Sequence, residues 1–211
     1  MKDLLRHVPV STRIWIDETY VDYTGEGHSL ESFAIQTENV IVCKSMSKAY
    51  ALSGVRSAYL CAAPHQLEEL RSINPPWAVS LPAQVAAVRA LQDPEYYAAR
   101  YSETGVLRQK LAGDLSSLGL DVIPGVANFL LTHLPESGPA AEEVVQRCQA
   151  RDLFLRDAAK MGSQMGRHAL RVAVKDATTN RRMIKILEEI LDQRFHGAAR
   201  SVASVRCAKP C

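Results

Sequence analysis

The sequence predicts an α/β protein, in which part of a large sheet-based domain is followed by a small α+β domain. The first observation is a set of three short apolar runs, 13–17, 39–43 and 57–62, which are typical of buried strands in an α/β sheet. The second is a change of pattern after Gly119, where short strand patterns and helical patterns follow one another. We therefore expect one sheet fragment and one compact lobe.

Strands open the first domain. Residues 13–17 end on polar side chains, as a buried strand does when its carboxyl end reaches a site. A polar, glycine-containing loop at 24–29 follows, and the runs 39–43 and 57–62 add two more strands. These three strands amount to half of a sheet.

Helices follow the strands. Pro64 is a favourable first residue for a helix over 64–73, which ends before Asn74-Pro75-Pro76. From 81 to about 118 the apolar residues recur at helical spacing, with an interruption expected at Asp93-Pro94 because proline breaks the helical hydrogen-bond ladder. This helical region is expected to bridge the two domains.

The second domain has strand and helix patterns of similar length. We expect strands at 121–123, 129–134, 153–156 and 170–174 and helices at 141–150 and 178–191. The last stretch is rich in Ala, Ser and Arg without either period, which predicts a frayed or disordered tail. The predicted organisation is a partial large domain at 1–115, a small domain at 116–192 and a tail at 193–211.

Composition and charge exclude several classes of protein. Apolar residues make up 47% of the 211 residues and charged residues 23%, so the chain is expected to fold. The formal net charge of +2 is too small for a fold built around nucleic acid. No run approaches the length of a membrane helix, and residues 1–10 lack the apolar core of a secretory signal. We expect a cytoplasmic protein that binds neither nucleic acid nor membrane.

The cysteines indicate neither a disulfide framework nor a metal site. The five cysteines are scattered, with no CxxC pair and no histidine at zinc-ligand spacing. The six histidines have no partner at such a spacing either. We expect reduced thiols and no bound metal.

The segment that carries chemistry is 45–56, directly after the second strand, with Ser45, Ser47, Lys48 and Arg56 among small residues. A lysine is usually a solvated surface residue, because burying an unpaired ammonium is costly. Past a buried strand it can point into a cleft, where desolvation and nearby positive charge favour the neutral amine that attacks a carbonyl. The two hydroxyls and the guanidinium would bind phosphate oxygens. The cluster therefore indicates a phosphorylated aldehyde.

Asp17 and Tyr20 follow the first strand, where ligands of open α/β sheets bind. A carboxylate there can keep a pyridine nitrogen protonated, and a phenol three residues on can bond the ring hydroxyl. The alternative is an aspartate that only caps a turn at the strand end, and spacing alone favours that alternative.

A family resemblance rests on the order of these residues. The pattern Asp17-x-x-Tyr20, then Ser45-x-Ser47-Lys48, then Arg56, is similar to fold-type I pyridoxal-phosphate enzymes of aminotransferase class I/II. Segments 17–20, 127–131, 155–157 and 170–172 resemble the histidinol-phosphate aminotransferase branch, which includes threonine-phosphate decarboxylase. The resemblance covers roughly residues 11 to 192. It implies a pyridoxal-phosphate-transferase-like three-layer sandwich, of which this chain holds the C-terminal portion.

The resemblance also implies a role for each matching residue. Lys48 would hold pyridoxal 5′-phosphate as a Schiff base and move the proton of the substrate. Asp17 would pair with the pyridine nitrogen and Tyr20 would bond the ring oxygen. The cofactor phosphate would be held by Ser45, Ser47 and Arg56.

Substrate binding is implied for residues of the second domain. Arg171 matches an arginine that binds the substrate carboxylate or an equivalent anion, Arg156 matches a second one, and Asn128 is a further candidate. The positions of these residues in the sequence agree with this role. Both arginines lie at or near the ends of apolar strands, where a charge needs a partner or an anion. The alternative is a structural ion pair of one arginine with Asp157 or Asp176.

The chain departs from this family in length. About 150 residues that usually come first have no counterpart, including a small-residue phosphate loop, an aromatic that stacks on the pyridine ring and much of the dimer interface. Either the sequence is a truncated product, whose exposed sheet edge would favour aggregation, or a partner chain supplies the missing half.

The resemblance leaves three functional alternatives. The first is amino transfer between an amino acid, or a phosphorylated amino substrate, and a 2-oxo acid in amino-acid biosynthesis, by an enzyme that is a homodimer in the full-length family. The second is decarboxylation of an O-phospho amino acid, favoured by residues 74–79. The third is an inactive fragment.

Overall fold

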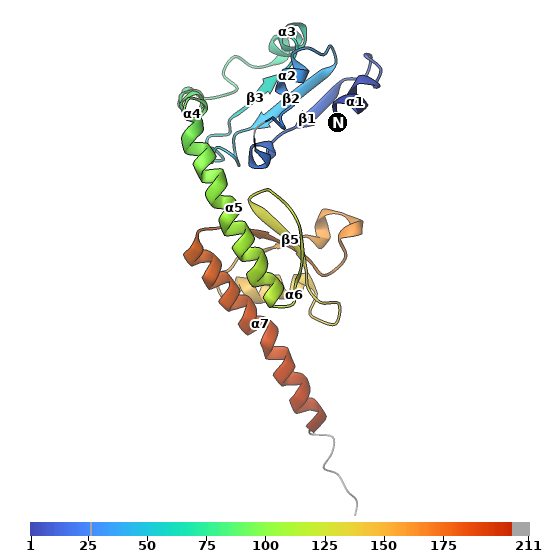
Figure 1. Cartoon of the computed structure of the whole chain (residues 1–211), viewed down its shortest axis with the longest axis vertical. Helices are drawn as coiled ribbons and strands as arrows, with labels where there is room; N and C mark the ends of the chain where they lie inside the picture. The colour runs from blue at the N-terminus through green and yellow to red at the C-terminus, as the bar shows by residue number, and fades with distance from the viewer. Residues whose placement is uncertain (26, 204–211) are drawn as a thin grey trace, which may run out of the picture. The chain divides into compact units, whose positions relative to one another are not determined.

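The computed structural model describes residues 1–25 and 27–203 and divides the chain into two compact units (Figure 1). The first unit is Met1–Ser102 and the second begins at Glu103. The division falls inside helix α5 (Pro94–Ser117), whereas the sequence predicts a boundary at residue 115, near the end of this helix. Helix α5 thus contributes side chains to both units.

A three-stranded sheet is the centre of the first unit. It contains β1 (Ile14–Asp17), β2 (Val40–Ser45) and β3 (Ala58–Cys61) in the order β1-β2-β3. β1 is parallel to β2, and β3 is antiparallel to it. The three predicted strands are therefore confirmed. Because β1 and β2 are parallel, their carboxyl ends lie at the same edge of the sheet.

Short helices cover this sheet and were not predicted. They are α1 (Lys2–Arg6), the 3₁₀ turn η1 (Val21–Thr24) and α2 (Glu31–Ala34). A helix of one turn is too short to show a 3.6-residue period, which explains why the sequence pattern missed them. The buried cluster that joins α1 and α2 to β2 consists of Leu5, Leu30, Ala34, Val40 and Val42.

The longer helices of the first unit agree with the sequence. Helix α3 (Pro64–Ile73) has the predicted bounds, and its end is fixed by Asn74, whose extended backbone is the conformation that a following proline imposes. Helix α4 (Leu81–Leu91) ends just before the predicted interruption at Asp93-Pro94, where α5 begins.

A four-stranded antiparallel sheet forms the second unit. Its strands β4 (Asp121–Ile123), β5 (Phe129–His133), β6 (Arg156–Asp157) and β7 (Ala169–Ala173) have the order β4-β5-β7-β6. Three agree with the sequence, but β6 lies later than the predicted strand at 153–156. The reason is local, because the N–H of Leu153 bonds the carbonyl of Cys148 and so belongs to the end of the preceding helix.

The helices α5, α6 (Ala141–Gln149) and α7 (Ala177–Ala203) pack on one face of this sheet. The core they form is aliphatic: Leu111, Leu115, Leu120, Leu130, Leu134, Ala141, Val144, Cys148, Leu153, Leu170, Val172, Met183, Ile186, Leu187 and Ile190. Helix α7 extends to Ala203, so the first part of the predicted tail is helical, while residues 204–211 lie outside the described residues. In the described part of the chain, no helix combines the length and the apolar character needed to cross a membrane.

Candidate active site

The end of β2 and the loop that joins it to β3 carry four of the six predicted site residues of the first unit. Ser45 is the last residue of β2, and its Oγ accepts the backbone N–H of Ser47 at 3.3 Å. Lys48 is exposed. Arg56 has φ +56°, in the left-handed region, and its guanidinium donates to the carbonyl of Ser53 at 3.2 Å. The end of β2 and this loop thus carry two hydroxyls, an amine and a guanidinium within twelve residues.

Asp17 ends β1 next to this loop. In the parallel register Asp17 lies opposite Cys43. Burial raises the pKa of the Cys43 thiol, and the negative charge of Asp17 raises it further. Asp17 Oδ1 accepts the backbone N–H of Thr19 at 2.9 Å and also the Thr19 hydroxyl. The turn cap that the sequence offered as an alternative is therefore present, and Oδ2 takes no part in it. The side chain is exposed and can bind a second group with that oxygen.

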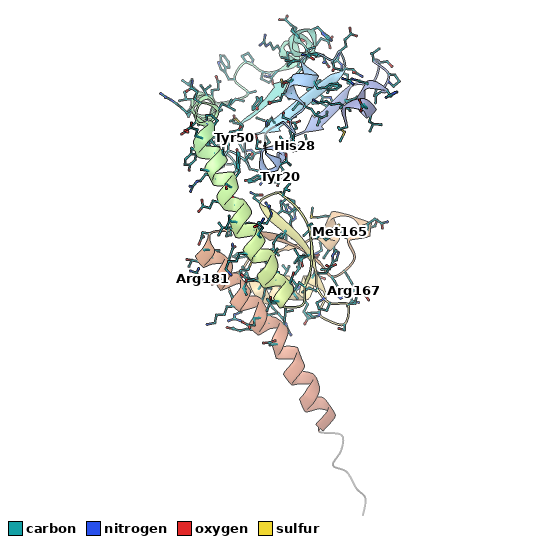
Figure 2. All side chains as sticks on the ribbon, viewed as in Figure 1. Tyr20, His28, Tyr50, Met165, Arg167 and Arg181 are labelled. Atoms are coloured by element: carbon teal, nitrogen blue, oxygen red, sulfur yellow. The ribbon has the colours of Figure 1, made fainter. Side chains whose placement is uncertain are left out.

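Tyr20 and the following turn complete this edge of the sheet. Tyr20 is half-buried and precedes η1. In the same turn the hydroxyl of Tyr23 donates to the carbonyl of Lys48 at 3.5 Å, which links the loop after β1 to the lysine loop. Figure 2 shows Tyr20 and Tyr50 near this end of the first unit.

A buried ionic cluster behind this edge was not predicted. Lys44 on β2 has 6% of its side chain exposed, and its Nζ lies 3.2 Å from Asp22 Oδ1 and 3.7 Å from Glu31 Oε2. Tyr59 on β3 donates to Glu31 Oε1 at 2.7 Å. A buried ammonium requires such partners, so the cluster fixes η1 and α2 against the sheet. The available signal was a lysine inside the apolar run of β2.

The predicted residues of the second unit lie on or beside its sheet. Arg156 on β6 and Arg171 on β7 are directly opposite one another in the ladder. The guanidinium carbon of Arg171 lies 4.0 Å from the centre of the Phe129 ring, a cation–π contact. Asn128 precedes β5, and its carbonyl accepts the N–H of Val174 at 2.9 Å.

The carboxylates considered as partners of these arginines make hydrogen bonds close to them in the chain. Asp157 accepts the N–H of Ala159 at 2.9 Å and lies 3.6 Å from Lys160 Nζ. Asp176 accepts the N–H groups of Thr178 and Thr179, each at 3.0 Å, at the start of α7. These hydrogen bonds hold the pKa of Asp176 below its usual value.

The structure thus divides the predicted residues into two sets. The set of the first unit lies at the carboxyl edge of β1 and β2: Asp17, Tyr20, Ser45, Ser47, Lys48 and Arg56. The set of the second unit lies on its sheet: Asn128, Arg156 and Arg171.

Comparison with known proteins identifies the family. Residues 1–190 match the family model described as aminotransferase class I and II. The chain belongs to this family. It is 30% identical over 196 residues to histidinol-phosphate aminotransferase from Methylobacillus flagellatus, covering 92% of this chain and 51% of that protein. The chain therefore spans about half the length of the curated relatives it matches.

Solved aminotransferase structures have the same fold. The histidinol-phosphate aminotransferase from Clostridium acetobutylicum matches with a TM-score of 0.79 at 21% identity, over 87% of this chain and 55% of that one. L-threonine-O-3-phosphate decarboxylase from Porphyromonas gingivalis matches with a TM-score of 0.72 at 24% identity, over 87% and 56%. The predicted fold class and the resemblance to this branch of the aminotransferases are confirmed.

The donor set of the first unit fits a phosphorylated pyridine aldehyde. Ser45, Ser47 and Arg56 are the neutral and cationic donors that phosphate oxygens accept from. Asp17 has an oxygen outside its turn, and Lys48 has the primary amine that an aldehyde requires. A solved relative from Sinorhizobium meliloti, 22% identical with a TM-score of 0.77 over 93% of this chain and 52% of that one, is in complex with pyridoxal-5′-phosphate.

Proposed function

We propose that this chain carries the cofactor and substrate residues of a pyridoxal-phosphate-dependent aminotransferase that acts on an anionic amino substrate, with a 2-oxo acid as the other reactant. The observation that carries the proposal is the grouping of Lys48, two hydroxyls and Arg56 at the end of β2 and on the loop after it, at the edge of the sheet where Asp17 ends β1. Membership of the aminotransferase class I and II family supports it.

The residues of the first unit would bind and orient the cofactor. Arg56 and the hydroxyls of Ser45 and Ser47 would hold its phosphate by charge-assisted hydrogen bonds. Asp17 would accept the N–H of the pyridine ring through Oδ2, and Tyr20 would donate to the ring oxygen. When bound, the cofactor supplies an electron sink that acidifies the Cα–H bond of the substrate.

Lys48 would act as the base. Its side chain is exposed at the edge of the sheet, so it would be free to contact a bound aldehyde and then a substrate carbon. As a neutral amine, Nζ would remove the proton from the substrate Cα and later return it. Without Lys48, the binding residues would still hold the phosphate, but this proton would have no carrier.

The arginine pair of the second unit supports an anionic substrate. Arg156 and Arg171 lie directly opposite one another in the ladder, so both guanidiniums could bind one anion. A carboxylate or phosphate there would accept charge-assisted hydrogen bonds from each of them. The relatives are named histidinol-phosphate aminotransferase, so an amino phosphate is the first substrate to test.

A borohydride trap tests the proposal on the chain itself. Protein mixed with pyridoxal 5′-phosphate is reduced with sodium borohydride, digested and analysed by mass spectrometry. We expect the phosphopyridoxyl group on the peptide that contains Lys48 and a loss of this label in Lys48→Arg. Lys110→Arg, at an exposed lysine of α5, is the matched control. A label spread over surface lysines, unchanged in Lys48→Arg, would contradict the proposal and favour an inactive fragment.

Decarboxylation of an O-phospho amino acid is the second candidate. Residues 74–79 resemble the decarboxylase branch, and the decarboxylase from Porphyromonas gingivalis shares the fold. Product analysis separates the reactions, because decarboxylation releases CO₂ whereas amino transfer consumes a 2-oxo acid.

A further inference from the structure

The segment that carries Lys48 is anchored on both sides of this exposed side chain. Met46, two residues before it, and Ala49, directly after it, are buried. The N–H of Leu52 bonds the Met46 carbonyl at 3.0 Å, and the N–H of Ala51 bonds the Lys48 carbonyl at 3.3 Å. Lys48 therefore lies on a tight turn, 46–52, which we name the lysine turn.

Ala51 gives the lysine turn a strained backbone. Its φ is +56°, in the left-handed region. A residue other than glycine adopts this region at a cost, because its Cβ comes too close to the following carbonyl oxygen. Such a conformation persists where the surrounding contacts impose it. The turn therefore depends on contacts made by its neighbours, and Tyr50 is the residue directly before Ala51.

Two tyrosine hydroxyls join the lysine turn to the 3₁₀ turn η1. The Tyr23 hydroxyl donates to the Lys48 carbonyl at 3.5 Å. Burial, the charges of Asp22 and Glu31, and a hydrogen bond to the Asp22 side chain raise the pKa of Tyr50 to about 12. Asp22 and Tyr23 both belong to η1, so both links run from this turn to the lysine turn.

Asp22 is itself held by the buried ionic cluster. Its Oδ1 lies 3.2 Å from Lys44 Nζ, and 15% of its side chain is exposed. Lys44 lies on β2, four residues before Lys48. Asp22, Lys44 and Tyr50 line the same cavity of the first unit, which places the three side chains together. The carboxylate thus connects the central strand, the turn after β1 and the lysine turn.

We propose that Tyr23 and Tyr50 are positioning residues for Lys48, because their hydroxyls tie the lysine turn to η1. Tyr20 directly precedes η1, and Asp17 lies three residues earlier. The two links therefore fix the separation between the residues proposed to bind the pyridine ring and the amine that reacts with it. A small misplacement of held groups slows their reaction even where binding is kept. This inference rests on the proposed function for its chemical consequence, whereas the links themselves belong to the chain without cofactor.

Timed quenching with borohydride separates positioning from binding. The full chain is mixed with pyridoxal 5′-phosphate at a series of concentrations and quenched at successive times, and the label on the Lys48 peptide is quantified. In Tyr50→Phe we expect the rate at saturating pyridoxal 5′-phosphate to fall about three- to tenfold, which corresponds to the loss of one hydrogen bond. The half-saturating concentration should change less than about twofold, because the proposed phosphate donors are untouched. A variant that only loosened the whole fold would change both quantities.

Tyr59→Phe is the matched control for Tyr50→Phe. It removes another hydroxyl of the ionic cluster, which donates to Glu31 at 2.7 Å and makes no link from η1 to the lysine turn. We expect the rate of labelling to stay at the native value even where the stability falls. Adding Ala51→Gly to Tyr50→Phe should restore most of the lost rate, because glycine adopts a positive φ without strain.

Hydrogen exchange tests the same links in the chain without cofactor. The backbone amides of 46–52 should exchange about three- to tenfold faster in Tyr50→Phe than in the native chain, and at the native rate in Tyr59→Phe. Absence of a Lys48 label in the native chain would contradict the proposed function and leave this measurement intact. Unchanged exchange at 46–52 in Tyr50→Phe, or an equal loss of labelling rate in Tyr50→Phe and Tyr59→Phe, would overturn the positioning role. If Tyr50→Phe does not fold, Tyr23→Phe, which removes the donor to the Lys48 carbonyl, takes its place in both comparisons.

Discussion

At the scale of single residues, the tyrosines around the buried ionic cluster have the most strongly perturbed protonation. Burial, followed by the charges of Asp22 and Glu31, raises the pKa of Tyr50 to about 12 from 10.0. Burial and the bond to Glu31 also raise the pKa of Tyr59, and burial and Asp22 raise that of Tyr101. These hydroxyls therefore stay protonated in the folded chain at a pH where they ionise in the unfolded chain.

The raised pKa of Tyr50 predicts a loss of stability at alkaline pH. Between about pH 10 and 12 the folded chain binds more protons than the unfolded chain, so the free energy of unfolding falls as the pH rises. Below pH 10 both states are protonated and this contribution is fully present. Urea unfolding at a series of pH values measures the slope.

The matched variants are Tyr50→Phe and Tyr96→Phe. Tyr50→Phe removes one titrating group and is expected to make the slope in this window shallower than in the native chain. Tyr96→Phe, at an exposed ring, is expected to change it less. A slope that is unaffected by Tyr50→Phe would contradict the assignment.

At the scale of elements, the end of α5 shows how backbone geometry positions a core. Gly119 has φ +82°, and its N–H bonds the Ser116 carbonyl at 2.9 Å while Leu120 N–H bonds the Leu115 carbonyl at 3.2 Å. This is the Schellman arrangement that terminates helices, and both leucines belong to the buried core. Gly113 lies in the same helix, and a Cβ there would meet no atom within 4 Å.

Two alanine substitutions in this helix should have opposite effects. Gly113→Ala is expected to raise the free energy of unfolding by about 0.5–1 kcal/mol, because a helix-interior glycine is less favourable than alanine. Gly119→Ala is expected to lower it by about 1–2 kcal/mol, because an L-residue is strained in the left-handed region. Urea unfolding of both variants under one set of conditions makes the comparison. Changes of the same sign would show that α5 does not end as described.

The pair of strands β6 and β7 carries the second prediction at this scale. Inorganic phosphate is expected to raise the thermal midpoint of the chain, because a ligand that binds only the folded state stabilises it. Arg156→Gln should reduce this effect, since one of two opposed guanidiniums is lost.

Controls separate this effect from general salt. Arg181→Gln, at an exposed arginine of α7 shown in Figure 2, should keep the full response to phosphate. Potassium chloride at equal ionic strength should not reproduce it. A full phosphate response in Arg156→Gln would show that this arginine does not bind the anion.

At the scale of the whole molecule, the sequence predicted most of what depends on periodicity and chain order. Helix α3 has its predicted bounds because Pro64 and Asn74-Pro75 set both ends locally. The pattern of Asp17-x-x-Tyr20, Ser45-x-Ser47-Lys48 and Arg56 indicated the family, which the match to the aminotransferase class I and II model confirms.

What the sequence did not predict depends on contacts between distant segments. Lys44 gave a signal as a lysine inside an apolar strand, but its partners Asp22 and Glu31 are known only once η1 and α2 fold onto the sheet. The shifted start of β6 has a local cause instead, because the N–H of Leu153 bonds the Cys148 carbonyl at the end of α6. The left-handed Arg56 leaves no mark in the residue pattern either.

The two tryptophans test how the first unit exposes apolar surface. Trp15 on β1 is 53% exposed, and Trp77, between α3 and α4, is 90% exposed. Several apolar residues of α4 are exposed as well. The chain has no other tryptophan. In dilute native protein we therefore expect emission typical of indole in water, strong quenching by acrylamide, and little change on unfolding in urea although circular dichroism changes fully. Trp15→Phe and Trp77→Phe assign the signal to each position. Blue-shifted emission, protected from acrylamide and lost on dilution, would instead show that a second copy of the chain covers this surface.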